Sequence, residues 1–233
     1  MYKSDKVGFS DLVLLPGNPE TVFATAWKVE RKPWTIISGG ANEEGGLYKS
    51  VNGGKEWMKI TQGLPTGLIG KIDLALPAND SKIVYALVEA PDDEGGVYKS
   101  VNQGDTFKLM SNNKALRTRP FYYTNIEADP IDPNKVYVMA TGYYRSLDGG
   151  QNWSRRSSPH GDNHAMWINP NNPDLFIQSN DGGANVTHNG GETWSTQINQ
   201  PTSEIYQEEV DDQYPNWLYG GQQANYTTVA VPS

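Results

Sequence analysis

The side chains best suited to chemistry gather in one short segment, His160-Gly161-Asp162-Asn163-His164, which holds two of the three histidines in the chain. Two imidazoles and a carboxylate form a ligand set that suits Zn²⁺ or a similar ion. The same side chains could instead hydrogen-bond the crowded start of a strand. The segment therefore leaves a structural role, a metal site at His160, Asp162 and His164, and a catalytic role open.

A second carboxylate stands in Asn180-Asp181-Gly182-Gly183. Glycoside cleavage needs two carboxyl groups, one acting as the acid and the other as a base or nucleophile. Asp162 with Asp181, or with Glu204, would supply such a pair. A plain turn before a strand is the simpler interpretation of the Asp181 segment, because Asp and Gly favour tight turns.

Other aromatic and polar side chains stand in long segments between the expected strands, where binding residues are frequent. Trp34, together with Arg31 and Lys32, could form a platform for stacking a sugar, or it could cover the rim of the fold. The full set of candidate ligand-binding residues is Trp34, Arg117, Arg119, Tyr122, His160, His164 and Gln222.

An eight-residue pattern, here called the octet, occurs four times and organises the chain. It reads hydroxyl, any residue, Asp or Asn, a Gly-rich pair, two polar residues and an aromatic. We expect the Asx side chain to accept backbone hydrogen bonds, the glycines to take the positive φ of a hairpin turn, and the ring to fold beneath that turn. The octets are 50–57, 100–107, 146–153 and 187–194, and their structural residues are Asn52, Trp57, Asn102, Phe107, Asp148, Trp153, Asn189 and Trp194.

The octets begin 50, 46 and 41 residues apart, with short apolar runs between them. A period in this range predicts a β-propeller with one four-stranded blade per repeat, although a solenoid remains a rival. In the first unit we expect strands at 9–15, 22–27, 47–50 and 56–60, with 28–46 as an insertion. The fourth unit should end in a strand at 193–197. A fifth unit, with strands at 205–210, 217–219 and 225–231, has no octet and no fourth strand.

The octets resemble the Asp-box (BNR) repeats of sialidase-like, sortilin-like and xyloglucan-cleaving propellers. The segments between them resemble a group of large bacterial propellers often labelled glycosyl hydrolase or sortilin-like. Asn180-Asp181-Gly182-Gly183 is similar to the segment that bears a catalytic Asp in the xyloglucan-cleaving enzymes. Ala224 stands where that bacterial group has Asp, so no role is carried to it. The segments that match the bacterial group are 31–35, 117–123, 160–167, 180–183 and 219–223.

The resemblance implies that the octet joins the third and fourth strands of each blade. In an up-and-down meander, the octets then share one rim with the turns between first and second strands. Loops between second and third strands, and between blades, occupy the opposite rim. We therefore expect the candidate site residues, including Glu204, on the rim away from the octets.

The composition narrows the range of possible partners and sites. A net charge of −8 disfavours nucleic acid as a partner, because phosphate binding depends on Lys and Arg. No apolar run is long enough to span a membrane. The absence of cysteine excludes disulfides and thiolate zinc sites.

These observations predict one all-β domain over residues 1–233, a β-propeller of about four complete blades and a partial fifth, forming a truncated or open ring. We expect it to be a piece of a larger propeller, secreted or periplasmic, with a possibility of self-association through open edges. The expected function is binding of carbohydrate or protein through the loop-bearing rim, without a cofactor. The alternative is a xyloglucanase-like glycoside hydrolase that uses Asp162 and Asp181.

Overall fold

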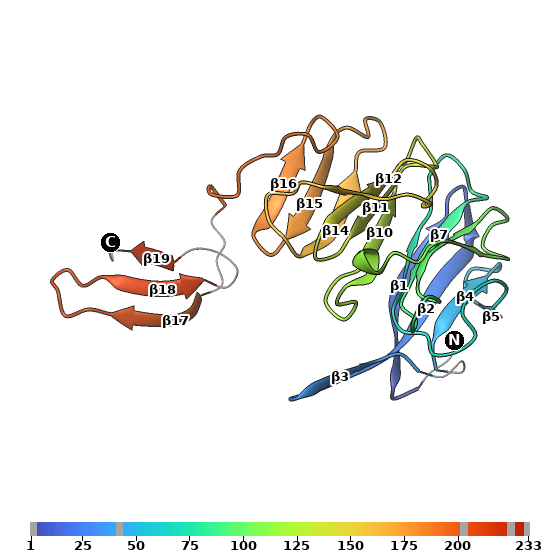
Figure 1. Cartoon of the computed structure of the whole chain (residues 1–233), viewed down its shortest axis with the longest axis horizontal. Coiled ribbons are helices and arrows are strands. Elements are labelled where there is room, and N and C mark those ends of the chain that lie inside the picture. The colour runs from blue at the N-terminus through green and yellow to red at the C-terminus, as the bar shows by residue number, and fades with distance from the viewer. Residues whose placement is uncertain (1–3, 41–43, 201–204, 223–226, 231–233) are drawn as a thin grey trace.

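The computed structural model describes residues 4–40, 44–200, 205–222 and 227–230, and these residues form an all-β fold. Antiparallel sheets follow one another along the chain, and each is a meander in which consecutive strands pair. Four of them form propeller blades arranged in an arc, and a fifth sheet stands apart from the fourth blade (Figure 1). The prediction of an open ring of about four blades and a partial fifth is therefore confirmed.

Apart from β1 and β2 the strands are short, as the turn-rich sequence predicts. Blade 1 holds β1 (Val7–Leu15), β2 (Asn18–Lys32), β3 (Thr35–Ser38), β4 (Gly46–Ser50) and β5 (Met58–Ile60). Blade 2 holds β6 (Ile72–Ala75), β7 (Val84–Val88), β8 (Gly96–Ser100) and β9 (Lys108–Ser111). Blade 3 holds β10 (Asn125–Ala128), β11 (Val136–Met139), β12 (Tyr143–Ser146) and β13 (Ser154–Arg156).

Blade 4 holds β14 (Asn163–Ile168), β15 (Phe176–Asn180) and β16 (Gly183–Thr187). The expected strand at 193–197 is not regular. At its position the Ser195 N–H donates to the Val186 carbonyl at 2.8 Å, so the fourth strand of this blade is reduced to a short contact. The fifth sheet holds β17 (Ile205–Val210), β18 (Leu218–Gln222) and β19 (Thr227–Ala230). Among the described residues, no helix is long and apolar enough to span a membrane.

The expected insertion at 28–46 is in large part a β-hairpin. β2 continues beyond the blade and pairs with β3, which reaches away from the blade (Figure 1). β-Branched residues in β3 favour this extended structure, and Pro33 with Trp34 occupies the turn. The hairpin is therefore an ordered arm, whereas the sequence alone suggested a loop.

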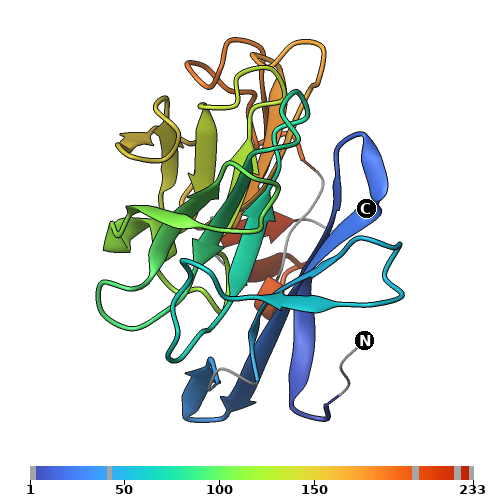
Figure 2. The same cartoon turned by 90° about the vertical axis from the view of Figure 1, so that its right-hand side faces the viewer.

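The core lies between blades, and the same type of contact recurs at three joints. The first strands of the four blades, β1, β6, β10 and β14, lie side by side and line the inside of the arc. Figure 2 turns blade 1 toward the reader and shows the blades behind it. At each joint a second-strand residue of one blade packs with a first-strand residue of the next. These pairs are Phe23 with Leu74, Tyr85 with Ile126, and Tyr137 with Met166.

The octets form the hairpin turns that their residues predict. In the third octet the Ser146 hydroxyl accepts a hydrogen bond from the Gly150 N–H at 2.9 Å and donates to Asp148 Oδ1 at 2.8 Å. Asp148 Oδ1 accepts the Asn152 N–H at 2.9 Å, and the Trp153 indole donates to the Gly150 carbonyl at 2.9 Å. The hydroxyl and Asx contacts recur in the other three octets.

The two rims differ as expected. A backbone N–H of each octet donates to a carbonyl at or near the turn between the first and second strands of its blade, for example Gly149 to Asn134 at 2.9 Å and Gly190 to Asp174 at 2.9 Å. Octets and these turns therefore share one rim, here called the octet rim. The loops between second and third strands, and those between blades, lie at the opposite rim, here called the loop rim.

Candidate functional site

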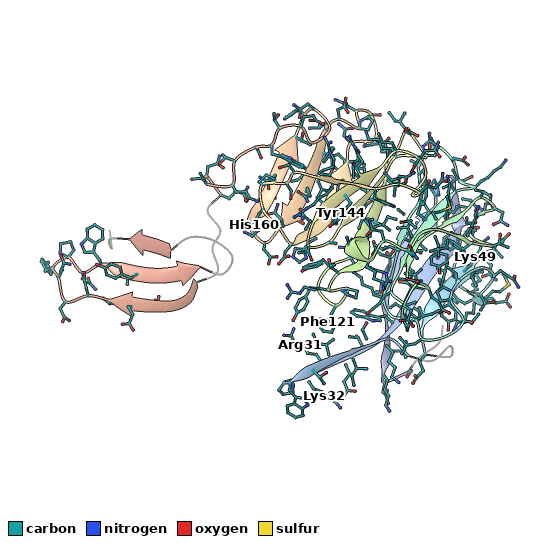
Figure 3. All side chains as sticks on the ribbon, in the orientation of Figure 1. Arg31, Lys32, Lys49, Phe121, Tyr144 and His160 are labelled. Carbon is teal, nitrogen blue, oxygen red and sulfur yellow. The ribbon has the colours of Figure 1, made fainter. Side chains whose placement is uncertain are left out.

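A run of aromatic rings and guanidinium groups crosses the loop rim. The Arg31 guanidinium, on the arm of blade 1, lies 5.6 Å from the Phe121 ring centre and 5.4 Å from that of Tyr122. Arg119 lies 4.8 Å from the centre of Tyr122 and 5.7 Å from that of Tyr123. These five residues, here called the ladder, join the arm of blade 1 to the loop between blades 2 and 3. Figure 3 shows Arg31 beside Phe121, with Lys49 away from them at the right.

The ladder leaves part of its surface free for a ligand. The side chain of Tyr122 is 41% exposed and lies between two guanidinium groups. Trp34, in the turn of the arm, is 82% exposed. No carboxylate among the described residues forms an ion pair with Arg31. The site therefore presents flat rings and positive charge on a chain that is negative overall.

Hydrogen bonds between blades 1 and 2 hold the base of the arm. The Trp27 indole donates to Ser38 Oγ at 2.9 Å, and that hydroxyl donates to Glu89 Oε2 at 2.6 Å. Glu89 also accepts the Lys71 N–H at 2.8 Å. Trp27 packs edge-on against Phe121 with ring centres 5.8 Å apart. The arm and the ladder are thus fixed to two blades, which supports a preformed binding surface.

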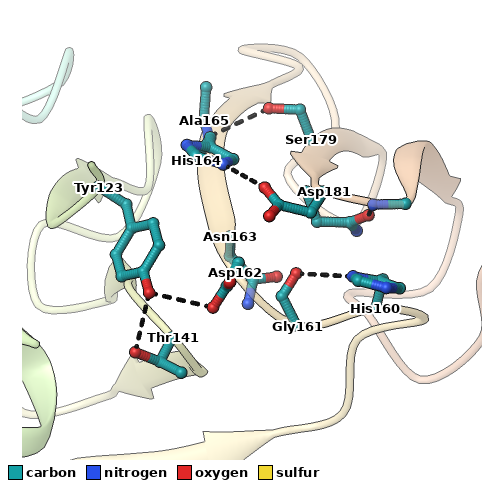
Figure 4. Close-up of polar contacts among 12 residues, drawn as sticks. Tyr123, Thr141, His160, Gly161, Asp162, Asn163, His164, Ala165, Ser179 and Asp181 are labelled. Carbon is teal, nitrogen blue, oxygen red and sulfur yellow. Dashed lines mark hydrogen bonds and ion pairs between the residues drawn. The ribbon is translucent and has the colours of Figure 1, made fainter. Parts of the chain in front are cut away.

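Asp162 lies at the end of the ladder and is engaged by two partners. It accepts a hydrogen bond from the Tyr123 hydroxyl at 3.1 Å (Figure 4). It also pairs with Arg119 at 3.7 Å. Arg119, Thr124 and Asp162 have φ values of 51°, 83° and 54°. Such values are costly for residues other than Gly, and they occur preferentially where function requires a fixed geometry.

Asp181 is held by His164. Their Nε2 and Oδ1 atoms lie 2.7 Å apart, and the His164 ring is edge-on to Tyr123 with centres 5.6 Å apart. The Asp181 N–H donates to the Asp162 carbonyl at 3.2 Å, so the two candidate acids lie on adjacent segments. Figure 4 shows the Asp162 carboxylate directed toward Tyr123 and the Asp181 carboxylate directed toward His164.

Among the described residues, the remaining candidates do not join the ladder or the pair of Asp162 and Asp181. Arg117 ties two loops together, since its guanidinium donates to the carbonyls of Ala90 at 3.0 Å and Asp92 at 2.5 Å. His160 bonds the Gly161 carbonyl through Nδ1 at 3.0 Å and lines an open depression with Arg155 and Arg156. Glu204 and the side chain of Gln222 lie outside the described residues.

The proposed metal ligands are not gathered as a metal ion requires. No group of three His, Asp or Glu side chains within the described part of the chain could hold an ion. His160 and His164 make their separate contacts with Gly161 and Asp181, and Asp162 contacts Tyr123 and Arg119. The described geometry does not support the metal interpretation of His160, Asp162 and His164.

A second polar group lies on the inside of the arc, where the sequence analysis named no residue. Asp11, Asp73 and Glu127 come from the first strands of blades 1, 2 and 3 and line one depression. Asp11 accepts the Leu74 N–H at 2.9 Å, and Asp73 accepts the Ile126 N–H at 2.8 Å. Each of these two carboxylates therefore binds the backbone of the next blade.

Burial disfavours the charged forms of this group. It raises the pKa of Asp73 to about 7, with a further rise from Asp11 that Lys71 opposes. It raises the pKa of Glu127 to about 8, and the charges of Asp73 and Asp11 act in the same direction. Burial also lowers the pKa of Lys71, whose Nζ donates to Asn125 Oδ1 at 2.7 Å. A charged residue in an otherwise apolar strand such as Ile72–Ala75 was the sequence signal for this group.

Comparisons with known proteins support the fold. The chain is similar to the GH74 xyloglucanase of Xanthomonas campestris, with a TM-score of 0.55 and 15% identity over 94% of this chain and 34% of the enzyme. It is similar to the GH74 enzyme of Niastella koreensis, with a TM-score of 0.50 and 16% identity over 81% of this chain and 38% of that one. YCF48 from Cyanidioschyzon merolae gives a TM-score of 0.53 and 12% identity, over the whole of this chain and 73% of that protein.

At these identities the similarity shows a propeller fold and no more. The chain spans about a third of the length of the two GH74 enzymes. No protein-family model and no curated protein sequence matches it.

Proposed function

We propose that this chain is a propeller module that binds a carbohydrate or protein ligand through its loop rim. The observation that carries the proposal is the ladder, in which the exposed Tyr122 ring lies between Arg31 and Arg119. Exposed aromatic and arginine side chains on a fixed surface are the residue types that contribute most to binding. The octets fit Asp-box repeats and have a structural role on the opposite rim, because their polar groups are used within the turns.

The proposal is tested by screening the chain on a glycan array and against a displayed peptide library, followed by calorimetry on the hits. Tyr122→Ala should weaken binding about tenfold, since a ring flanked by two cations contributes about 1–2 kcal/mol. Tyr214→Ala is the matched control, because Tyr214 is fully exposed and lies outside the loop rim. Equal affinity of Tyr122→Ala and the unaltered chain would exclude the ladder as the binding surface.

A glycoside hydrolase is the second candidate, favoured by the adjacency of Asp162 and Asp181. GH74 enzymes, one of them a xyloglucanase, are among the solved structures with this fold, so xyloglucan is the first substrate to assay. Reducing ends should then be released, and Asp162→Asn and Asp181→Asn should each lower the rate at least about a hundredfold. Asp162 is paired with Arg119 and Asp181 is hydrogen-bonded to His164, and these contacts within the chain favour binding over hydrolysis. Release at equal rates by the variants would exclude this pair.

A further inference from the structure

The three joints between blades follow one rule. A second-strand residue of the earlier blade, Phe23, Tyr85 or Tyr137, packs with a first-strand residue of the later blade, Leu74, Ile126 or Met166. The second-strand residues are fully buried, and the first-strand residues are 5%, 1% and 7% exposed. Strand register places each set at equivalent positions. Every blade therefore has a leading face, which contacts the next blade, and a trailing face, which contacts the previous one.

Blade 4 has an uncovered leading face. Ile177 occupies the position of Phe23, Tyr85 and Tyr137, yet it is 39% exposed. Trp167 pairs with Ile177 across β14 and β15 and is 59% exposed. Two large apolar residues on adjacent strands are thus exposed on the face by which each earlier blade contacts the next one.

Blade 1 has an uncovered trailing face. Leu12 occupies the position of Leu74, Ile126 and Met166, and it is 61% exposed. Leu14, two residues further along the same face, is 56% exposed. The two ends of the arc therefore expose opposite halves of the joint that the structure forms three times.

The fifth sheet fits the open face of blade 4 less well than blade 1 does. The Asp211 N–H donates to the Trp217 carbonyl as the Asn169 N–H donates to the Leu175 carbonyl, at the turn between first and second strands. Counting back from this turn places Glu208 at the position of Met166, and therefore of Leu12. Docking there would move a carboxylate into an apolar joint, which is unfavourable without a cationic partner. Figure 1 shows the fifth sheet set apart from blade 4.

We propose that the open face of blade 4, formed by Trp167 and Ile177, binds the open face of blade 1, formed by Leu12 and Leu14, in a second copy of this chain. The interface continues the joint already present between blades 1, 2, 3 and 4. Two such contacts would close two arcs into a ring of eight blades, within the range known for propellers. The paired arcs would also enclose the depression lined by Asp11, Asp73 and Glu127.

The chain has no cysteine, so single cysteines can test which faces meet. Leu12→Cys and Ile177→Cys chains are mixed at about 50 μM and oxidised under mild conditions. The mixture should yield a disulfide-linked species of twice the chain mass, whereas each variant alone should not. Leu147→Cys replaces Leu12→Cys in the control mixture, because Leu147 is equally exposed, at 61%, but lies in an octet. Equal cross-linking in the control mixture would overturn the proposal.

Two further measurements separate the alternatives. Sedimentation equilibrium of the unaltered 233-residue chain should show dimers, and Trp167→Glu should weaken association at least about tenfold without changing the circular dichroism spectrum. In a Leu218→Cys/Ile177→Cys chain, efficient cross-linking within one molecule would identify the fifth sheet as the occupant and overturn the proposal. A chain that stays monomeric at about 100 μM would also overturn it.

Discussion

Replacing Glu127 with Gln should stabilise the chain at alkaline pH and leave it unchanged at acid pH. The pKa of Glu127 is raised from 4.5 to about 8 by burial and by the neighbouring Asp73 and Asp11. A carboxyl group with a raised pKa keeps a proton in the folded state that the unfolded chain has released. Stability is therefore lost as pH rises from about 4.5 to about 8.

The size of the stability change follows from the difference between the folded and unfolded pKa values of Glu127. At about 1.4 kcal/mol per pH unit, the difference between the two pKa values corresponds to about 5 kcal/mol as an upper limit. Part of this is lost because the residue is only half-buried and the carboxylates titrate together. We expect Glu127→Gln to be more stable than the unaltered chain by about 2 kcal/mol at pH 9, and equally stable within about 0.5 kcal/mol at pH 4.

Urea unfolding followed by tryptophan fluorescence between pH 4 and pH 9 measures the difference. Glu209→Gln is the control, because Glu209 is exposed on the fifth sheet and should show no such trend. A Glu127→Gln chain whose advantage is constant with pH, or larger at pH 4, would refute the assignment of a buried proton to this carboxyl.

Three further changes test other parts of the structure by urea unfolding. Asp73→Asn should become more stable than the unaltered chain as pH rises from 3.8 to about 7, and it keeps an acceptor for the Ile126 N–H. An Asp73→Asn chain less stable than the unaltered chain at pH 8 would contradict this. Asp148→Asn should change stability by less than about 0.5 kcal/mol at pH 7, since Asn occupies this position in the other octets. Asp148→Ala should cost about 1–2 kcal/mol, and equal effects of the two variants would argue against the Asx hydrogen bonds. Gly104→Ala should cost about 2–3 kcal/mol, because φ is +78° and the new Cβ would lie 2.6 Å from Phe23. Gly53→Ala should cost less, because its Cβ meets only the flexible end of Glu20, and the reverse order would contradict the packing argument.

The sequence was most informative where a local pattern determines local structure. Each octet contains the hydroxyl, the Asx residue, the glycines and usually the indole that its turn needs, so the turns and the blade period followed directly. The rim that carries Tyr122, Asp162 and Asp181 followed from counting strands. The arm at 28–46 was not predicted as a hairpin, because its register depends on pairing between β2 and β3 that no turn motif announces.

The contacts within the site depend on distances between blades, which a single sequence does not encode locally. Arg31 and Tyr122 are far apart in the chain and meet only because blade 1 carries an arm that reaches the loop after blade 2. The pairing of His164 with Asp181 is a contact within blade 4 and depends on the register of β14 against β15. Asp73 and Glu127 escaped notice because single acids in short strands resemble ordinary exposed positions until the neighbouring blades are in place.

The octet turns also contact the blade that precedes them. A Cβ on Gly104, in the turn of blade 2, would lie 2.6 Å from Phe23 of blade 1, and a Cβ on Gly150 would make a tight contact of 3.1 Å with Val97 of blade 2. A residue inserted into an octet would therefore separate two blades as well as lengthen a hairpin. The exposed turn of the arm at Trp34 can change in length without that penalty. Homologues of this chain should accordingly differ most in the loops of the loop rim. Changes at the octet rim should come mainly from duplication or deletion of entire repeats.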